Sequence, residues 1–222
     1  MKIIAQIRTD FPEKFGIPRQ AGLVDGALGR IVFEPEYRTA EALRGIEGYS
    51  HLWLIWQFSE AVREEWSPTV RLPRLGGNRR VGVFATRSPY RPNPIGLSSV
   101  RLVSIELTEN EGTVLVVSGV DMLDGTPIYD IKPYLAFTDS HPDAVSGFAD
   151  DVKDYKLEVV FPEGIEKLLD GRDLSALAEI LSEDPRPSYQ NDPERIYGMR
   201  YKEHEVKFKV VGDRLTVVDI VK

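Results

Sequence analysis

Alternating apolar and polar positions predict β-strands through the first 140 residues. Short runs of this kind, bounded by Gly, Pro, Asn or Asp, are typical of half-buried strands. They cover residues 2–8, 29–33, 49–58, 81–85, 97–103, 100–107, 113–121 and 128–135. No helical pattern of 10–15 residues lies between them, and only residues 40–44 suggest a short helix. The pattern argues against βαβ units and predicts a mainly β fold, either an antiparallel barrel or a sandwich.

The pattern changes in the last third of the chain. Residues 137–154 are polar and carry Pro142 and Gly147, which is typical of a linker. We therefore expect two domains, 1–145 and 150–222, the second a small α+β domain. Its predicted elements are a strand at 156–161, a short helix at 163–169, a helix at 174–181 capped by Asp173, and strands at 199–211 and 214–221.

A proline-rich segment between two predicted strands is the most informative stretch of the sequence. In residues 87–96, RSPYRPNPIG, three prolines fix their own φ angles and favour extended conformations for the residues before them. The loop carries Arg87, Tyr90, Arg91 and Asn93. A loop that is already rigid loses less entropy when it binds a ligand. A rigid surface turn without a ligand is the alternative interpretation.

Residues 49–58, YSHLWLIWQF, predict a central strand, in which we interpret Trp53 and Trp56 as core residues and His51 as a structural histidine. The sequence contains no cysteine, which excludes disulfides and cysteine-based zinc sites. Its three histidines have no metal-ligand spacing, so we expect no metal. No apolar run reaches 18 residues, and the apolar start is short for a signal peptide. We expect a cytoplasmic protein that does not associate with a membrane.

Arginine is concentrated in one part of an otherwise acidic chain. The net charge is −7, yet residues 66–105 contain no Asp or Glu. The same interval holds Arg71, Arg74, Arg79, Arg80, Arg87, Arg91 and Arg101. The planar guanidinium suits phosphate and carboxylate groups, so the interval predicts an anion-binding face. The alternative is that these arginines pair with acids elsewhere in the chain.

The motifs and polar residues of the sequence favour a binding site over catalysis by a nucleophile of the protein. The sequence has no G-x-S-x-G elbow, no P-loop and no Rossmann glycine pattern. Residues 9–22 form a long loop with Lys14, Arg19 and Gln20, and such loops are usually functional or disordered. Arginines, carboxylates and turns suit a zwitterionic or phosphorylated small molecule. Methyl transfer from S-adenosylmethionine is compatible with this inventory, although composition alone does not single it out.

Five motifs, in order, resemble a known family. They are PRQAGL, GIEGYSHLWLIWQF, PRLGGNRRVGVFATRSPYRPNPIGLS, DMLDGTPIYDIKPYL and DPRPSY, and they span most of the chain. The sequence is similar to the TrmO/YaeB-like (TsaA-like) tRNA N6-methyltransferases. The resemblance implies a one-sided antiparallel β-barrel that binds S-adenosylmethionine, a homodimer, and a C-terminal module that helps to dock tRNA. The implied product is N6-methylated threonylcarbamoyladenosine at position 37 of tRNA.

The resemblance also implies roles for particular residues. The S-adenosylmethionine site would comprise Arg19, Gln20, Ala21, Phe58, Ser59, Glu60, Arg87, Leu97, Asp124, Gly125, Thr126 and Pro127. Arg87 would hold the methionine carboxylate and Asp124 the ribose. The catalytic candidates are Asn93, Asp130, Lys132 and Tyr134, with Asp130 as proton acceptor. The RNA-binding candidates are Arg71, Arg74, Arg80, Arg91, Arg186 and Tyr189, where Tyr189 would stack on a base.

Two other functions fit the residues. The first is a non-catalytic RNA-binding barrel that uses only the arginine face, with strongly salt-dependent binding. The second is a small-molecule methyltransferase on the same barrel. Asp130, Lys132 and Tyr134 alternate along a predicted strand, and the alternative interpretation of these residues is a solvated strand face. The alternative interpretation of the DPRP segment is a simple helix stop.

Overall fold

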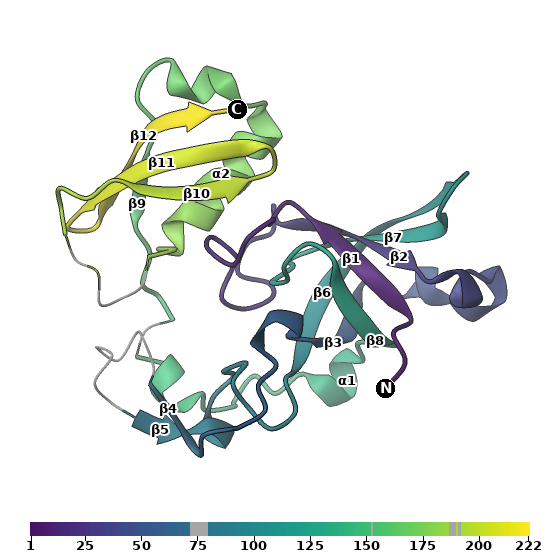
Figure 1. Ribbon diagram of the computed structural model, residues 1–222. Coiled ribbons are helices and arrows are strands. Elements are labelled where there is room, and N and C mark those ends of the chain that lie inside the picture. Colours follow the sequence, from purple (N-terminus) through teal and green to yellow (C-terminus); the bar gives the residue numbers. More distant parts are fainter. Residues whose placement is uncertain (72–79, 152, 187–189, 191) are drawn as a thin grey trace.

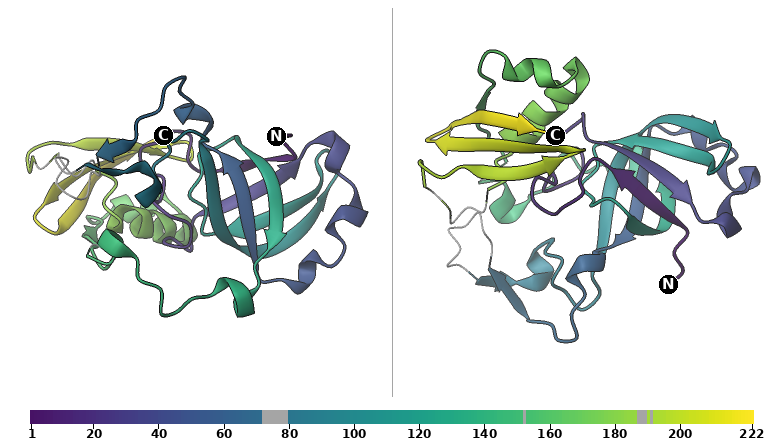
Figure 2. Two further views of the ribbon diagram at one scale, coloured as in Figure 1. Left: turned by 90° about the horizontal axis from the view of Figure 1, so that it is seen from below. Right: turned by 45° about the horizontal axis from the view of Figure 1, so that its top comes forward.

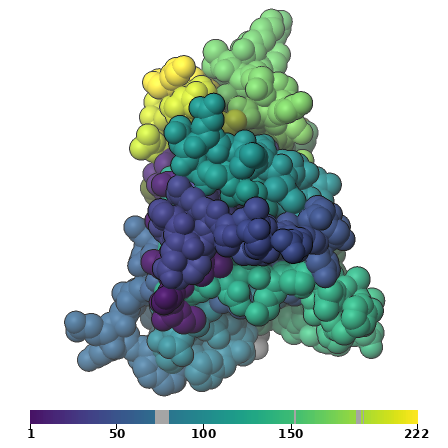
Figure 3. Space-filling model, turned by 90° about the vertical axis from the view of Figure 1, so that its right-hand side faces the viewer, coloured from purple at the N-terminus to yellow at the C-terminus, as the bar shows by residue number. Residues whose placement is uncertain are grey.

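The computed structural model describes residues 1–71, 80–151, 153–186, 190 and 192–222. Figure 1 shows a barrel, an arm below it that carries β4 and β5, and a C-terminal sheet with its helix above it. Seen from the side, the barrel lies between the C-terminal part and the arm (Figure 3). Within the described residues, no helix has both the length and the apolar character needed to cross a membrane.

Six antiparallel strands close the barrel in the order β1-β2-β7-β6-β3-β8. They are β1 (Ala5–Thr9), β2 (Leu28–Phe33), β3 (His51–Gln57), β6 (Ile95–Thr108), β7 (Gly112–Ser118) and β8 (Thr126–Pro133). The pairing of β1 with β8 removes the free edges of the sheet, and Figure 2 shows the closed ring from two further sides. The predicted mainly β, antiparallel barrel is confirmed.

Strand β3 follows the predicted alternation closely. Leu52, Leu54 and Trp56 are buried inside the barrel, and the residues between them face outward. Trp53 is one of those outward residues, and its indole N–H donates to Asp139 Oδ2 at 2.8 Å. The prediction that Trp53 is a core residue is therefore wrong, because strand alternation allows only one of two tryptophans three positions apart to face inward.

The region around the proline-rich loop differs from the prediction in detail. The two overlapping runs 97–103 and 100–107 form one long strand, β6, which bends at a register shift between Leu102 and Ser104. The run 81–85 is extended only in β5 (Arg80–Gly82), which pairs with β4 (Thr69–Arg71), and continues as a 3₁₀ helix over Val83–Ala85. The predicted helix near residue 40 is a 3₁₀ helix, Ala40–Leu43.

The C-terminal part is the predicted combination of a sheet and a helix. The sheet has the order β10-β11-β12-β9, with β9 (Glu158–Val160), β10 (Tyr197–Tyr201), β11 (His204–Val211) and β12 (Arg214–Val221). Helices α1 (Ala136–Asp139) and α2 (Gly171–Ser182) are the two α-helices assigned in the described chain.

Two details of the C-terminal part correct the sequence predictions. Asp170, not Asp173, caps α2, because its carboxylate accepts from two backbone N–H groups of the first turn. The run 199–211 is two strands, since Lys202 turns the chain at φ 53°.

The long N-terminal loop, residues 10–27, is ordered between the barrel and the C-terminal part. Phe15 stacks on Phe208 of β11, with ring centroids 6.4 Å apart. The Gly26 N–H donates to Glu179 Oε2 of α2 at 3.1 Å. Buried residues of the barrel, this loop and the C-terminal sheet form one continuous apolar cluster. Of the two sequence interpretations of this loop, disorder is therefore wrong.

We expect Gly96→Ala to destabilise the fold. A Cβ atom at Gly96 would lie 2.2 Å from the Trp56 ring, and the buried indole has little room to move. Overpacking of this kind costs about 1–3 kcal/mol of the free energy of unfolding, which chemical denaturation measures. Gly48→Ala is the matched control, since no atom lies within 4 Å of its added Cβ. Equal stability of both variants would contradict the expected clash.

Candidate active site

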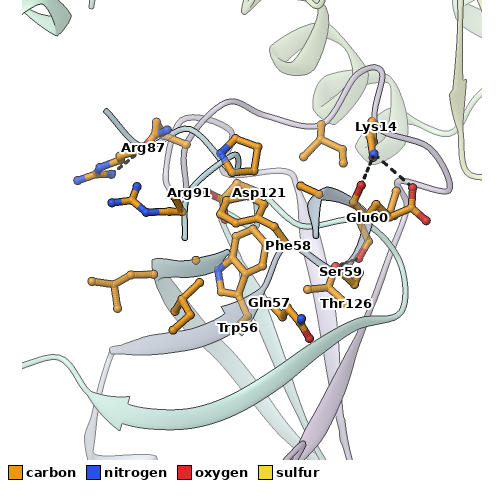
Figure 4. Close-up of a pocket in the computed structure, with 18 of the residues that line it drawn as sticks. Lys14, Trp56, Gln57, Phe58, Ser59, Glu60, Arg87, Arg91, Asp121 and Thr126 are labelled. Carbon is orange, nitrogen blue, oxygen red and sulfur yellow. Dashed lines mark hydrogen bonds and ion pairs between the residues drawn. The ribbon is translucent and has the colours of Figure 1, made fainter. Parts of the chain in front are cut away.

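A pocket of about 770 Å³ opens at one end of the barrel. Its walls come from the ends of β3 and β6, the loop around Arg19, the proline-rich loop and the connection between β7 and β8. Figure 4 shows side chains from these segments pointing into a common space. The volume suits a small organic ligand, because such pockets usually measure roughly 300–1,000 Å³.

The floor of the pocket is aromatic. The rings of Trp56 and Phe58 are 4.2 Å apart between centroids and inclined at 56°. Trp56 fits beside β6 only because Gly96 has no side chain at the point of contact. The exposed Leu97 follows on the same strand and also lines the pocket. This surface suits the face of a flat aromatic ring such as a purine.

The proline-rich loop is held by its own hydrogen bonds. The Thr86 hydroxyl donates to the Val83 carbonyl at 2.8 Å, and Arg91 Nη1 donates to the Thr86 carbonyl at 3.1 Å. The Asn93 carbonyl accepts from the Ile95 N–H at 2.7 Å. These short-range bonds agree with the rigidity that the prolines predict. The loop thereby presents Arg87 and Arg91 to the pocket in fixed positions.

Polar contacts tie the pocket walls to one another. Arg87 Nη1 donates to Gln20 Oε1, which joins the proline-rich loop to the N-terminal loop. On the other side, Lys14 Nζ donates to the Glu60 carbonyl at 3.1 Å and pairs with its carboxylate at 3.4 Å. Glu60 lies in the 3₁₀ helix Ser59–Ala61, directly after β3. Both loops therefore converge on the same space.

Asp121 is a second carboxylate of the pocket, and it is partly buried. Its Oδ1 accepts from the Ser98 hydroxyl at 2.6 Å, and Ser98 Oγ in turn accepts from the Trp56 N–H at 2.9 Å. Burial raises the pKa of Asp121, while the hydrogen bonds from Ser98 and the backbone of Ala21, and the charge of Arg87, oppose that rise.

The predicted turn at residues 124–127 is present, although only part of it faces the pocket. Gly125 has φ 76°, and Thr126 is buried and lines the pocket. Asp124 Oδ1 accepts from the Thr9 N–H at 3.0 Å, and its Oδ2 lies 3.9 Å from Arg8 Nη1. The Asp124 carboxylate is thus partly engaged by the barrel itself.

The structure brings most of the predicted cofactor residues together. Those that line the pocket are Arg19, Gln20, Phe58, Ser59, Glu60, Arg87, Leu97 and Thr126, together with Arg91 and Asn93 from the other two predicted groups. Four predicted cofactor residues adjoin the pocket wall without lining it, namely Ala21, Asp124, Gly125 and Pro127.

The other catalytic candidates lie on the outer face of the barrel. Lys132 Nζ and Asp130 Oδ2 form an ion pair of 2.8 Å. Tyr134 follows the end of β8, and its ring lies 5.5 Å from that of Trp53. Trp53 pairs with Lys132 across the two strands and also lines the pocket. This face is therefore continuous with the pocket through the indole of Trp53.

The RNA-binding candidates fall into three groups. Arg71 and Arg80 are exposed on the β4–β5 arm, where Arg80 donates to Thr69 and Ser67. Arg74 and Tyr189 lie outside the described residues. Arg186 is 7% exposed, and its guanidinium donates to both carboxylate oxygens of Asp184, at 2.8 and 3.1 Å.

Sequence reasoning missed several residues of the pocket. Lys14, Gln57 and Thr86 line the pocket, although no pattern in the sequence assigns them a role in it. Trp56 is the predicted core residue, yet one side of its ring also forms the floor of the pocket. Asp121 begins the motif DMLDG, so its place in that motif was the available signal. Among the described residues, no group of three His, Cys, Asp or Glu side chains could hold a metal ion.

The fold and the pocket define a class of protein. A closed β-barrel carries at its end an aromatic floor, two loop arginines and a partly buried carboxylate, which together suit a zwitterionic ligand with a flat ring. The family model described as the tRNA-methyltransferase O N-terminal domain matches residues 6–140, and the TrmO C-terminal domain matches residues 154–222. The chain belongs to the tRNA-methyltransferase O family.

Individual relatives agree over almost the whole chain. The tRNA (adenine(37)-N6)-methyltransferase of Escherichia coli is 40% identical over 93% of this chain and 91% of its own. A putative S-adenosylmethionine-dependent methyltransferase of Pseudomonas aeruginosa is 40% identical over 98% of this chain and 95% of its own. The crystal structure of TrmO from Pseudomonas aeruginosa superposes with a TM-score of 0.79 at 35% identity, covering 99% and 97% of the two chains.

We expect Arg186→Ala to destabilise the protein by about 3 kcal/mol, because the buried carboxylate of Asp184 loses its charged partner and keeps only the neutral hydroxyl of Tyr155 as a side-chain partner among the described residues. Burial alone would raise the pKa of Asp184, but Arg186 holds it below its usual range. The stabilisation by this pair is therefore present above the ordinary aspartate pKa and is lost as the pH falls through the lowered value. Denaturant titrations at pH 7 and in acid measure both effects. A variant as stable as the wild type would contradict this account.

Proposed function

We propose that this protein is an S-adenosylmethionine-dependent methyltransferase that methylates N6 of threonylcarbamoyladenosine at position 37 of a threonine-type tRNA. The observation that carries the proposal is the pocket, in which an aromatic floor lies beside Arg87 and Asp121. Membership of the tRNA-methyltransferase O family supports it independently. The relative of Escherichia coli is named for N6 methylation of adenine 37 in tRNA, and the relative of Pseudomonas aeruginosa is named for its dependence on S-adenosylmethionine.

The groups present in the pocket fit S-adenosylmethionine. An adenine ring needs apolar walls, which Trp56 and Phe58 provide. The amino-acid end carries a carboxylate and an ammonium group, and the pocket offers groups of both opposite charges. We assign the carboxylate to Arg87 and a ribose hydroxyl to Asp124. The remaining proposed contacts are Arg19, Gln20, Ala21, Ser59, Glu60, Leu97, Gly125, Thr126 and Pro127.

The bound cofactor supplies an activated methyl group, so the protein does not need a nucleophile of its own. The protein's task is to hold donor and acceptor close together and to exclude water. The outer face that continues from the pocket carries Asp130, Lys132 and Tyr134, and we propose that the modified base lies there, with Asn93 at the border. Asp130 is our candidate for the acceptor of the N6 proton, and its ion pair with Lys132 keeps the carboxylate in place.

The arginines of the arm support an RNA substrate over a small-molecule acceptor. Arg71 and Arg80 are exposed on the arm next to the loop that carries Arg91. We propose that these residues and Arg74 contact the tRNA backbone, whose phosphates bind guanidinium groups well. We propose residues 1–145 as the cofactor-binding domain and residues 150–222, including Tyr189, as the tRNA-docking domain. The burial of Arg186 in its ion pair with Asp184 argues against the direct RNA contact that the sequence suggests for it. A cytoplasmic homodimer completes the proposal.

Isothermal titration calorimetry with S-adenosylhomocysteine should give micromolar binding by the wild type. Arg87→Ala should weaken it by about tenfold to a hundredfold, because a charge-assisted hydrogen bond contributes roughly 1.5–3 kcal/mol. Arg44→Ala is the matched control, since Arg44 is exposed and pairs only with Glu41 among the described residues. No binding by the wild type would refute the proposed function and favour the RNA-binding barrel.

The double variant Arg71→Ala, Arg80→Ala should methylate tRNA much more slowly at 150 mM salt, while its affinity for S-adenosylhomocysteine stays at the wild-type value. The reason is that these residues lie on the arm and do not line the pocket. The double variant Lys2→Ala, Arg44→Ala removes the same charge at exposed positions outside the arm, the pocket and the C-terminal domain, and it should leave the rate of methylation unchanged. Unchanged methylation of tRNA by the arm variant would refute the proposed role of the arm, whereas no methylation of tRNA by the wild type would favour a small-molecule acceptor.

A further inference from the structure

The Asp121 carboxylate lies in the pocket wall, where its hydrogen bonds join β6 to the N-terminal loop. It follows β7 by three residues and faces the pocket. Burial makes the charged form costly, as the raised pKa of Asp121 reflects. A carboxyl group at a position where burial disfavours its ionised form indicates an interaction with a positive charge.

A directional chain of hydrogen bonds holds the Asp121 carboxylate in place. The indole N–H of Trp56 can only donate, so Ser98 Oγ accepts from it at 2.9 Å. The single hydroxyl hydrogen of Ser98 is then free to donate to Asp121 Oδ1, at 2.6 Å. Ser98 is 1% exposed and Trp56 4%, so water does not compete for these bonds. The chain therefore presents an acceptor carboxylate, fixed to the aromatic floor.

The carboxylate keeps acceptor capacity toward the pocket. An ionised carboxylate has about four lone-pair sites, of which Ser98 and the backbone N–H groups of Ala21 and Asp121 occupy three. No ion pair within 4.0 Å between described residues includes Asp121. Glu60, the other acid that lines the pocket, is already paired with Lys14 and lies with 59% of its side chain exposed. Asp121 is thus the carboxylate better placed to receive a cation from a ligand.

Arg87 lies near enough for its charge to act on Asp121, and Figure 4 shows both residues among those around the pocket. Neighbouring positive and negative groups complement an α-amino acid, whose carboxylate and ammonium group are attached to one carbon atom. We propose that Asp121 binds the α-ammonium group of the methyl donor while Arg87 binds its carboxylate. This inference rests on the proposed function, because it assigns a role in the same cofactor site.

Asp121→Asn tests the role of the charge with little change in shape. The Asn oxygen still accepts from Ser98, so the hydrogen-bond chain survives. The raised pKa means that the folded state disfavours the carboxylate, so loss of the charge should leave the melting temperature unchanged or raise it. Asp143→Asn, at an exposed position away from the pocket, is the matched control.

The measurement is calorimetry with two ligands, S-adenosylhomocysteine and its analogue with hydrogen in place of the α-amino group. The wild type should bind the analogue at least about tenfold more weakly, because a charge-assisted bond is lost. Asp121→Asn should bind both ligands equally, each at least about tenfold more weakly than the wild type binds S-adenosylhomocysteine. Asp143→Asn should retain the preference of the wild type.

The possible outcomes separate the two proposals. A wild-type protein that binds both ligands equally overturns the role of the ammonium group, and so does an Asp121→Asn variant that keeps the wild-type preference. Loss of the same factor for both ligands in the variant also overturns it, since the effect is then structural. A wild-type protein that binds neither ligand refutes the proposed cofactor itself. The comparison of the two ligands on the wild type remains decisive if the variant does not fold.

Discussion

The contact between the indole of Trp56 and the backbone of Gly96 is the constraint on which the site depends. Any side chain at Gly96 would overlap the ring, so β3 and β6 can approach there only because glycine is present. The contact fixes the plane of the indole, which places one ring face against Phe58 at the pocket and turns the N–H toward Ser98. A core packing contact therefore also sets the floor of the pocket and the direction of the hydrogen bonds that reach Asp121.

The N-terminal loop links the pocket to the C-terminal part. One side of the loop brings Arg19 and Gln20 to the pocket, where Gln20 meets Arg87. The Arg19 guanidinium also donates to the carbonyls of Asp184 at 2.6 Å and Arg186 at 3.3 Å. Arg19, which lines the pocket, thus also contacts the backbone of the buried pair Asp184 and Arg186. A movement of that segment would reach the pocket through Arg19.

The surroundings of the arginines differ between the arm, the proline-rich loop and the C-terminal part. The chain as a whole is acidic, yet the arm and the proline-rich loop carry arginines without any acid among residues 66–105. Arg71, Arg80 and Arg87 lie on exposed segments, where a guanidinium remains available to an anion. Arg186 lies outside that interval, and its guanidinium forms a buried ion pair with Asp184. Local surroundings, and not the residue type, therefore decide which arginines remain available for an external ligand.

The sequence by itself determined the local structure. Alternation predicted the barrel strands, because a strand places successive side chains on opposite faces whatever its neighbours are. The prolines predicted the rigid loop, because they restrict the backbone without any tertiary contact. Motifs quoted from the sequence contain most of the residues that line the pocket.

Only the tertiary structure decided which of these local features meet. The sequence could not separate the inward Trp56 from the outward Trp53, or show that Arg186 is buried, because both depend on how distant segments pack. Asp121 was missed for the same reason. Its partners Ser98 and Ala21 are far from it in the chain, and its neighbours in sequence resemble an ordinary turn. Closure of the barrel brings Asp121 close to Ser98 and Ala21. The local sequence pattern does not indicate which strands will pair.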